Sequence, residues 1–297
     1  MTDSSETLKR RLGAVPSLPV EKAPKVRDWV SAAGSSNSAA SAGVGAELED
    51  APGPHGYYPA VNYGPLVPEK DVSALGNMQF GDCVPAALIH HWQWWAAKKY
   101  GETRNAMAAK LVEPTTEEAL SLYKIVNPAW NKADPATDTG CQPVDVFNYA
   151  MRYGVVIGGM RRLLAGFAEI EPDDLSSLKF AIEHGVGVMR IWNMPKTAET
   201  TNDWIMDDPV WLPGVELIGA AAPGSWGPHA TYTLAHNENY FTTLSWGEEI
   251  HFTGEWAMAY GLRHYMLVWN SESQFGNLDV MRLKADLIEL RNGLPQS

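Results

Sequence analysis

Two side chains could form a nucleophile and its base, although they lie far apart in the sequence. Cys83 directly precedes a long apolar segment that opens with Val84 and Pro85, and His229 opens the run HATYTL. A thiol at the first turn of a helix is favoured as thiolate by the helix dipole and by backbone N–H groups without a helical partner. An imidazole held beside such a thiol can take up its proton. The pair therefore predicts thiol-dependent nucleophilic chemistry if the fold brings the two residues together.

The alternative for Cys83 is a buried, unreactive side chain, which is the commoner role of a cysteine. Its neighbour Asp82 adds a carboxylate that would oppose thiolate formation. Elsewhere, His90 and His91 are flanked by tryptophans and are expected to pack in a core, and no Cys/His spacing resembles a zinc site. We expect no bound metal and no cofactor.

The elements that must position these residues differ between the two halves of the chain. Apolar periodicity and cap signals predict helices over 84–100, 115–126, 143–152 and 173–185. After residue 185, short β-branched and aromatic runs predict strands near 185–192, 230–235, 240–246, 249–253 and 264–269. Helices followed by strands predict an α+β fold, with the thiol on a helix and the imidazole on a strand.

A motif surrounds the cysteine: residues 76–83 read GNMQFGDC, a GN-x-x-x-GDC pattern. It is followed in order by the helical half, by His229 and by Ser245-Trp246-Gly247. This order resembles the papain-like cysteine peptidases, and among them the divergent phage-borne or bacterial type. The resemblance covers about residues 71–270. It implies a two-lobed fold, in which a helical lobe precedes a β-rich, barrel-like lobe and the active-site cleft lies between them.

The resemblance also implies a role for each matching residue. Cys83 would be the nucleophile and His229 the base, and the Asn77 amide would complete an oxyanion hole with the Cys83 backbone N–H. Trp246 would shield the catalytic pair from water. Two further loop positions would support the cleft, Gln79 and Gly81.

The clearest departure from the family pattern concerns the third catalytic residue. Leu244 stands two residues before Trp246, where peptidases of this family carry the Asn that orients the histidine. A leucine side chain cannot accept an imidazole N–H. Asn237, Asn239, a backbone carbonyl or a water could substitute, and the sequence does not choose among them.

Two more departures concern the segment after Thr139. Gln142-Pro143 replace the Asn-Gly-Gly whose backbone pairs with a peptide in the family. Phe80 replaces the cysteine that would bridge to the position of Cys141, so both cysteines of the chain are expected to be reduced.

Three functions remain open on these residues. The first is a cysteine hydrolase, a peptidase or amidase with weak or narrow activity toward a peptide or protein substrate. The second is a catalytically silent papain-like module with a structural or binding role, for example a phage virion protein. The third is an acyl-transfer variant, such as a transglutaminase-like activity, that uses the same pair.

Composition limits the partners and the location. The chain has 23 Lys and Arg against 35 Asp and Glu and a formal net charge of −12, which disfavours nucleic-acid binding. No apolar run is long enough for a transmembrane helix, and residues 1–30 lack the apolar region of a signal peptide. A location in the cytoplasm or in a virion is expected, without membrane contact.

The chain is expected to divide into four regions. Residues 1–30 form an N-terminal arm that could bind a protein partner. Residues 31–70 are a linker, first low in complexity and then rich in Pro, Gly and Tyr. Residues 71–270 form the papain-like domain, and residues 271–297 a C-terminal helical tail.

Overall fold

The structure is a computed structural model of the 297-residue chain and describes residues 25, 60–67, 72–101, 113–200, 203–204 and 216–269. Of the predicted arm only Lys25 is described, and of the predicted linker only residues 60–67. The predicted tail, residues 271–297, and its helix lie outside the described residues. The four-region division therefore stays a prediction.

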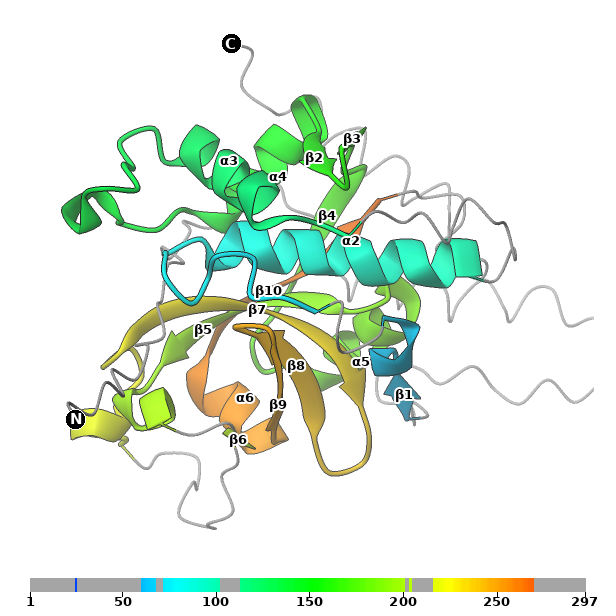
Figure 1. Ribbon diagram of the computed structural model, residues 1–297. Helices are drawn as coiled ribbons and strands as arrows, with labels where there is room; N and C mark the ends of the chain where they lie inside the picture. Colours follow the sequence, from blue (N-terminus) through cyan, green and yellow to red (C-terminus); the bar gives the residue numbers. More distant parts are fainter. Residues whose placement is uncertain are drawn as a thin grey trace, which may run out of the picture.

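The first half of the domain is helical, as predicted. The helix α2 (Cys83–Gly101) runs through the middle of the molecule, with α3 (Thr116–Val126) and α4 (Pro143–Arg152) on one side and the sheet on the other (Figure 1). Residues 83–96 of α2 are all buried, which explains why apolar and aromatic side chains occur all round this helix. The start of α3 is a capping box between Thr115 and Glu118, as the sequence indicates.

The second half is dominated by one mostly antiparallel sheet. Its strand order is β4-β10-β5-β7-β8-β9-β6, and β1 pairs with β7 outside this path. Among the strands that the structure describes, only β6 and β9 pair in parallel. The bounds of the strands are β1 (Val61–Asn62), β4 (Gly166–Ile170), β5 (Val188–Met194), β6 (Asp203–Trp204), β7 (Gly227–His236), β8 (Phe241–Ser245), β9 (Glu248–Phe252) and β10 (Gly261–Val268).

Smaller elements connect these parts. A separate hairpin follows α4 and consists of β2 (Val155–Ile157) and β3 (Met160–Arg162). Two further α-helices are α5 (Leu175–Gly185) and α6 (Gly254–Tyr260). Four short 3₁₀ helices complete the described elements: η1 (Gly64–Leu66), η4 (Pro135–Thr137), η5 (Lys196–Thr200) and η6 (Gly219–Ala221).

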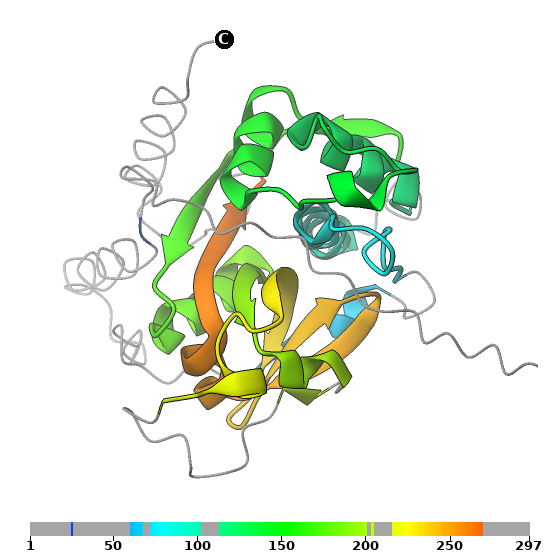
Figure 2. The same ribbon diagram turned by 90° about the vertical axis from the view of Figure 1, so that its left-hand side faces the viewer.

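Hydrophobic cores fill both faces of the sheet. On one face, side chains such as Ile191 and Tyr232 pack with those of α2, α3 and α4. On the other face, Trp192 and Phe252 pack with α5 and α6, and Figure 2 shows these layers from the side. Because side chains alternate along a strand, neighbours such as Ile191 and Trp192 enter different cores. The predicted α+β class is thus confirmed.

The barrel-like form expected from the resemblance is not found among the described residues. The sheet is open, with β4 and β6 at its two ends, whereas a barrel requires the end strands to pair with each other. The outer edge of β4 instead carries an isolated parallel bridge from Glu169 to Lys25. The arrangement in two lobes stays a prediction.

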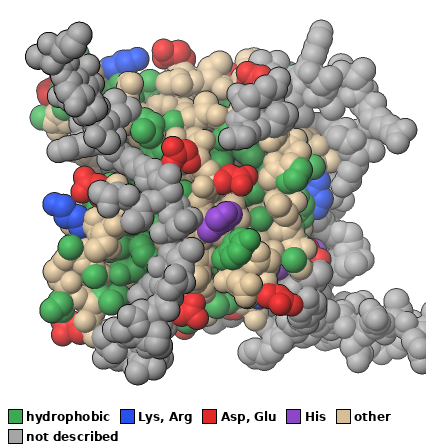
Figure 3. Space-filling view, turned by 60° about the horizontal axis from the view of Figure 1, so that its bottom comes forward, with side chains coloured by type: hydrophobic (Ala, Val, Ile, Leu, Met, Phe, Trp, Pro, Cys, Tyr) green, Lys and Arg blue, Asp and Glu red, His purple; other side chains and the backbone are tan. Residues whose placement is uncertain are grey.

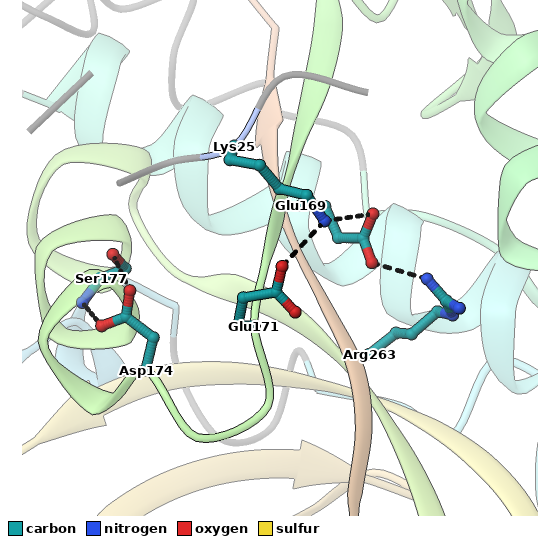
Figure 4. A network of polar contacts seen from close by, with 6 residues as sticks. All are labelled: Lys25, Glu169, Glu171, Asp174, Ser177 and Arg263. Carbon is teal, nitrogen blue, oxygen red and sulfur yellow. Dashed lines mark hydrogen bonds and ion pairs between the residues drawn. The ribbon is translucent and has the colours of Figure 1, made fainter. Parts of the chain in front are cut away.

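Ion pairs hold this outer edge of β4 (Figure 4). Lys25 Nζ lies 2.9 Å from a carboxylate oxygen of Glu169 and 3.2 Å from one of Glu171. The other oxygen of Glu169 is 2.6 Å from Arg263 on β10. Glu169 is buried, so the two cations offset the cost of removing its charge from water.

The surface is in keeping with the acidic composition. Figure 3 shows one face, on which acidic side chains are scattered among apolar and neutral ones. Among the described helices, none combines the length and the apolar character that crossing a membrane requires.

Candidate active site

Cys83 is the first residue of α2, and the loop that precedes it is fixed in place by polar contacts. The Gly81 N–H donates to both carboxylate oxygens of Asp138, at 3.0 Å each. Gly76, at the start of the motif, has φ +100°, and a Cβ there would lie 2.9 Å from Asp82 Oδ2. The motif glycine at 76 is therefore needed for a left-handed turn packed closely against the start of the helix.

The same Asp138 carboxylate reaches the segment of the second cysteine. The Tyr123 hydroxyl donates to Asp138 at 2.7 Å and accepts from the Gly140 N–H at 2.9 Å. Cys141 follows directly, and burial raises the pKa of its thiol, with the nearby Cys83 adding to this shift. Neither cysteine is in a disulfide, as predicted.

Asp82 is fully buried beside Cys83. Desolvation raises the pKa of its carboxyl well above the ordinary value, and the charge of Asp138 raises it further. Hydrogen bonds from its own backbone, the second-largest cause, and from Asn77 lower the pKa but do not outweigh desolvation. Burial disfavours the charged carboxylate, so it weakens the opposition to a Cys83 thiolate that the sequence alone suggests.

His229 lies near the beginning of β7, in the interior, opposite Trp192 of β5. Its imidazole stacks on the indole of Trp246, with ring centroids 4.4 Å apart and planes inclined by 11°. Its Nε2 lies 2.6 Å from Ser245 Oγ. An indole on one face and a hydroxyl at one nitrogen fix both the plane and the rotation of the imidazole ring.

The start of α2 and the start of β7 meet at the sulfur. The N–H of Ala230, the residue after His229, donates to Cys83 Sγ at 3.3 Å. Both Cys83 and His229 are buried, with exposed fractions of 1% and 0%. The fold thus brings together the helix start and the strand start that the sequence singles out.

Trp246 and Gly247 form the two-residue turn between β8 and β9, closed by the pair Ser245 and Glu248. Both turn residues have positive φ, 54° and 82°, as a type I′ hairpin turn requires. Gly247 suits this conformation, and a Cβ there would also lie 2.9 Å from the Ala74 backbone nitrogen. Trp246 adopts it at a conformational cost, which is a common feature of functional sites.

The residue that contacts His229 in place of the expected Asn is Ser245, and the sequence reasoning missed it. Leu244 belongs to the core on the α2 face of the sheet. Its side chain points away from the face of His229, since neighbouring residues of a strand alternate. Asn237 accepts from the backbone N–H groups of Asn239 and Tyr240 and is used in the turn after β7. Alternation along β8 alone does not identify position 245, because the register of β8 against β7 decides which residues share the face of His229.

Asn77 and Gln79 lie in the loop before Cys83. The Asn77 side chain is buried, and its amide nitrogen donates to the Phe80 carbonyl at 3.3 Å. Gln79 is exposed, and its backbone N–H donates to the Gly76 carbonyl at 2.9 Å. The oxyanion role of Asn77 and the supporting role of Gln79 stay predictions.

The two histidines of α2 pack in the core, as predicted. His91 Nδ1 accepts from the Trp269 indole N–H at 3.0 Å, and Nε2 lies 3.3 Å from the Gly187 carbonyl oxygen. Both ring nitrogens are thus used by the protein. Within the described ranges, no group of three or more His, Cys, Asp or Glu side chains is placed to hold a metal ion.

Comparison with known proteins gives structural matches only. No family model matches the chain, and no curated protein matches its sequence. Xylellain, a cysteine protease from Xylella fastidiosa, matches over 88% of this chain and 97% of its own, with a TM-score of 0.57 and 12% identity.

Two further solved structures match less well. A structure concerning the mite allergens Blo t 1 and Der p 1 has a TM-score of 0.46 and 12% identity, covering 76% of this chain and 74% of its own. The proform of the ragweed cysteine protease Amb a 11 has a TM-score of 0.42 and 13% identity, covering 82% and 76%.

At 12% identity, the likeness to xylellain concerns the fold and leaves activity open. The chain has a papain-like fold.

Proposed function

We propose that the chain is a cysteine hydrolase that cleaves a peptide or a related amide, with Cys83 as nucleophile and His229 as base. The observation that carries this proposal is the contact between the start of α2 and the start of β7 at Cys83 Sγ. The stacked Trp246 and the hydrogen-bonded Ser245 support it, because they hold the imidazole in one orientation. We further propose that the helical half and the sheet form two lobes, with the substrate bound between them.

The proposed reaction has two stages. The Cys83 thiol gives its proton to His229 and attacks the carbonyl carbon, and the oxyanion is stabilised by the Cys83 backbone N–H and the Asn77 amide. The C–N bond then breaks and the leaving amine takes the proton from His229. The acyl group is now held on Cys83 as a thioester. Water, deprotonated by His229, attacks its carbonyl carbon, the C–S bond breaks, the carboxylic acid leaves, and His229 returns the proton to the sulfur.

The pH dependence of Cys83 alkylation tests the pair. Because Cys83 is only 1% exposed, the shape of the rate profile is more informative than the absolute rate. We expect iodoacetamide to react with Cys83 below pH 7, well under the ordinary thiol pKa of about 8.5. His229→Ala should return the profile toward that value. Cys141→Ala, which removes the other thiol, should leave the profile unchanged.

The same measurement separates the proposal from the silent module, for instance a structural protein of a phage particle. The burial of Cys83 and His229 and the leucine at position 244 favour that alternative. A Cys83 profile that follows an ordinary thiol, and that His229→Ala does not change, would exclude the hydrolase. Turnover of peptide amides that Cys83→Ala abolishes would exclude the module.

A further inference from the structure

We infer that Ser245 is the positioning residue of this site: its hydroxyl orients His229 in place of the amide missing at position 244. A role of Ser245 in catalysis depends on the proposed hydrolase function, whereas the orientation of His229 by Ser245 does not. The inference starts from the 2.6 Å contact between Ser245 Oγ and His229 Nε2, between two side chains that are 5% and 0% exposed. Water does not compete for a hydrogen bond that is buried in this way, so the two side chains keep their relative orientation.

In this chain, the pairing of β7 with β8 places position 245, and not position 244, on the face of His229. Leu244 pairs with Tyr232 across β7 and β8, and both side chains enter the core on the α2 face. Ser245 and His229 lie on the opposite face of the same two strands. The residue that orients His229 is thus at position 245 instead of 244, and it lies on the face of the sheet opposite to that of Leu244.

A hydroxyl differs chemically from an amide oxygen in this position. An amide oxygen only accepts and therefore favours a proton on Nε2, whereas a serine hydroxyl can donate to Nε2 or accept from it. Ser245 can consequently stay bonded both to neutral His229 and to the imidazolium formed when Cys83 loses its proton. In either state Ser245 engages Nε2, and the proposed proton exchange with the thiol would use Nδ1.

The surrounding hydroxyls offer a matched control. Thr243 lies two residues before Ser245, on the same face of β8, and is also buried. Its hydroxyl donates to Thr231 at 2.7 Å, and Trp192 donates to Thr231 at 2.8 Å. Thr243→Val removes a buried hydroxyl from the same strand, one whose hydrogen bonds go to Thr231 and Thr233 and not to His229.

The test uses the ¹⁵N NMR spectrum of His229 in the full chain, which reports the ring tautomer whether or not the protein hydrolyses anything. Ser245→Ala should redistribute the proton between Nδ1 and Nε2. It should also move the midpoint of the imidazole titration down by about one pH unit, since a hydrogen bond to the charged form is lost. Ser245→Thr, which keeps the hydroxyl, should restore the wild-type spectrum, and Thr243→Val should leave it unchanged.

A second measurement connects the spectrum to the reaction. Ser245→Ala should lower kcat on the order of tenfold or more with little change in KM, because orientation of the base matters in the transition state. An unchanged tautomer and midpoint in Ser245→Ala, or equal shifts in Thr243→Val, would overturn the inference. If instead Cys83 proves unreactive while the spectra behave as expected, the proposed function fails and the orienting contact stands.

Discussion

Two buried side chains of the motif loop, Asn77 and Asp82, are linked to each other and to the backbone around Cys83. The Asn77 amide nitrogen bonds to the Phe80 carbonyl, and a hydrogen bond from Asn77 lowers the pKa of Asp82 against the stronger effect of burial. An amide nitrogen has two hydrogens. To serve as an oxyanion donor, Asn77 must therefore turn one of them toward the substrate.

Replacement of Asn77 by alanine should lower kcat on the order of 10²-fold, the usual effect of losing one oxyanion donor. The measurement is turnover of a peptide amide, with the Cys83 alkylation profile as control. Alkylation involves no tetrahedral oxyanion, so it should change much less. Equal losses in both assays would show that Asn77 only shapes the loop.

At the residue scale, the sequence predicts the positions of Cys83 and His229, and the structure has them there, while their catalytic roles are proposals. Cys83 at a helix start and His229 at a strand start could be located from periodicity and caps. Ser245 could not be chosen from spacing to Trp246, because the direction of a side chain depends on strand register. The raised pKa of Asp82 depends on burial, which only the folded chain defines.

Among the elements, α3 is joined to the β2–β3 hairpin by one carboxylate. Glu118 closes the capping box by accepting from the Thr115 N–H at 2.9 Å. It also accepts from the N–H groups of Gly158 and Gly159, at 3.1 and 2.7 Å, in the turn of the hairpin. Three backbone donors thus depend on one side chain.

Glu118→Ala should lower the free energy of unfolding by about 1–3 kcal/mol, as expected when a cap is lost and backbone donors lose their acceptor. Urea unfolding measures this change. Glu117→Ala is the matched control, because Glu117 is exposed in the same turn of α3. Similar unfolding midpoints for the two variants would contradict the bridging role.

The elements found from the sequence are those with strong local signals. Capping residues and Pro143 marked the helices, and aromatic and β-branched runs marked five strands. β4 was missed because GFAEI contains a buried glutamate, whose burial depends on Lys25 and Arg263 from distant parts of the chain. α6 was missed although Thr253 caps it by accepting from the Trp256 N–H.

In the whole molecule, the candidate site depends on both hydrophobic cores. Cys83 belongs to the core on the α2 face, and Trp246 belongs to the core under the other face of the sheet. Several histidines are buried in the same interior. Burial lowers the pKa of His90 to about 4 and of His91 to about 3, and it lowers that of His264 well below its ordinary value.

These histidines predict loss of stability in acid. Below about pH 6.5 the unfolded chain takes up protons that the folded chain does not bind, so stability falls as the pH drops toward about 4 and 3. Each histidine contributes up to about 1.4 kcal/mol per pH unit in this window. Asp82, with its raised pKa, acts in the opposite direction and becomes stabilising as the pH falls.

Urea midpoints measured from pH 7 to pH 4 check this expectation. His91→Gln should be less stable at pH 7, because the Trp269 and Gly187 contacts are disturbed. Its stability should nevertheless depend less on pH than that of the wild type. A wild-type midpoint that stays constant over this range would refute the assignment of neutral buried histidines.

The contact of Gly247 with Ala74 has a consequence for how the chain can vary. It places the turn that follows Ser245 directly against the segment that leads to the GNMQFGDC motif. A side chain at 247 would require residues 73 and 74 to retract, and the loop that carries Asn77 would shift with them. The two motifs are therefore coupled by packing: among relatives of this chain, a change at position 247 should be accompanied by a change just before Gly76.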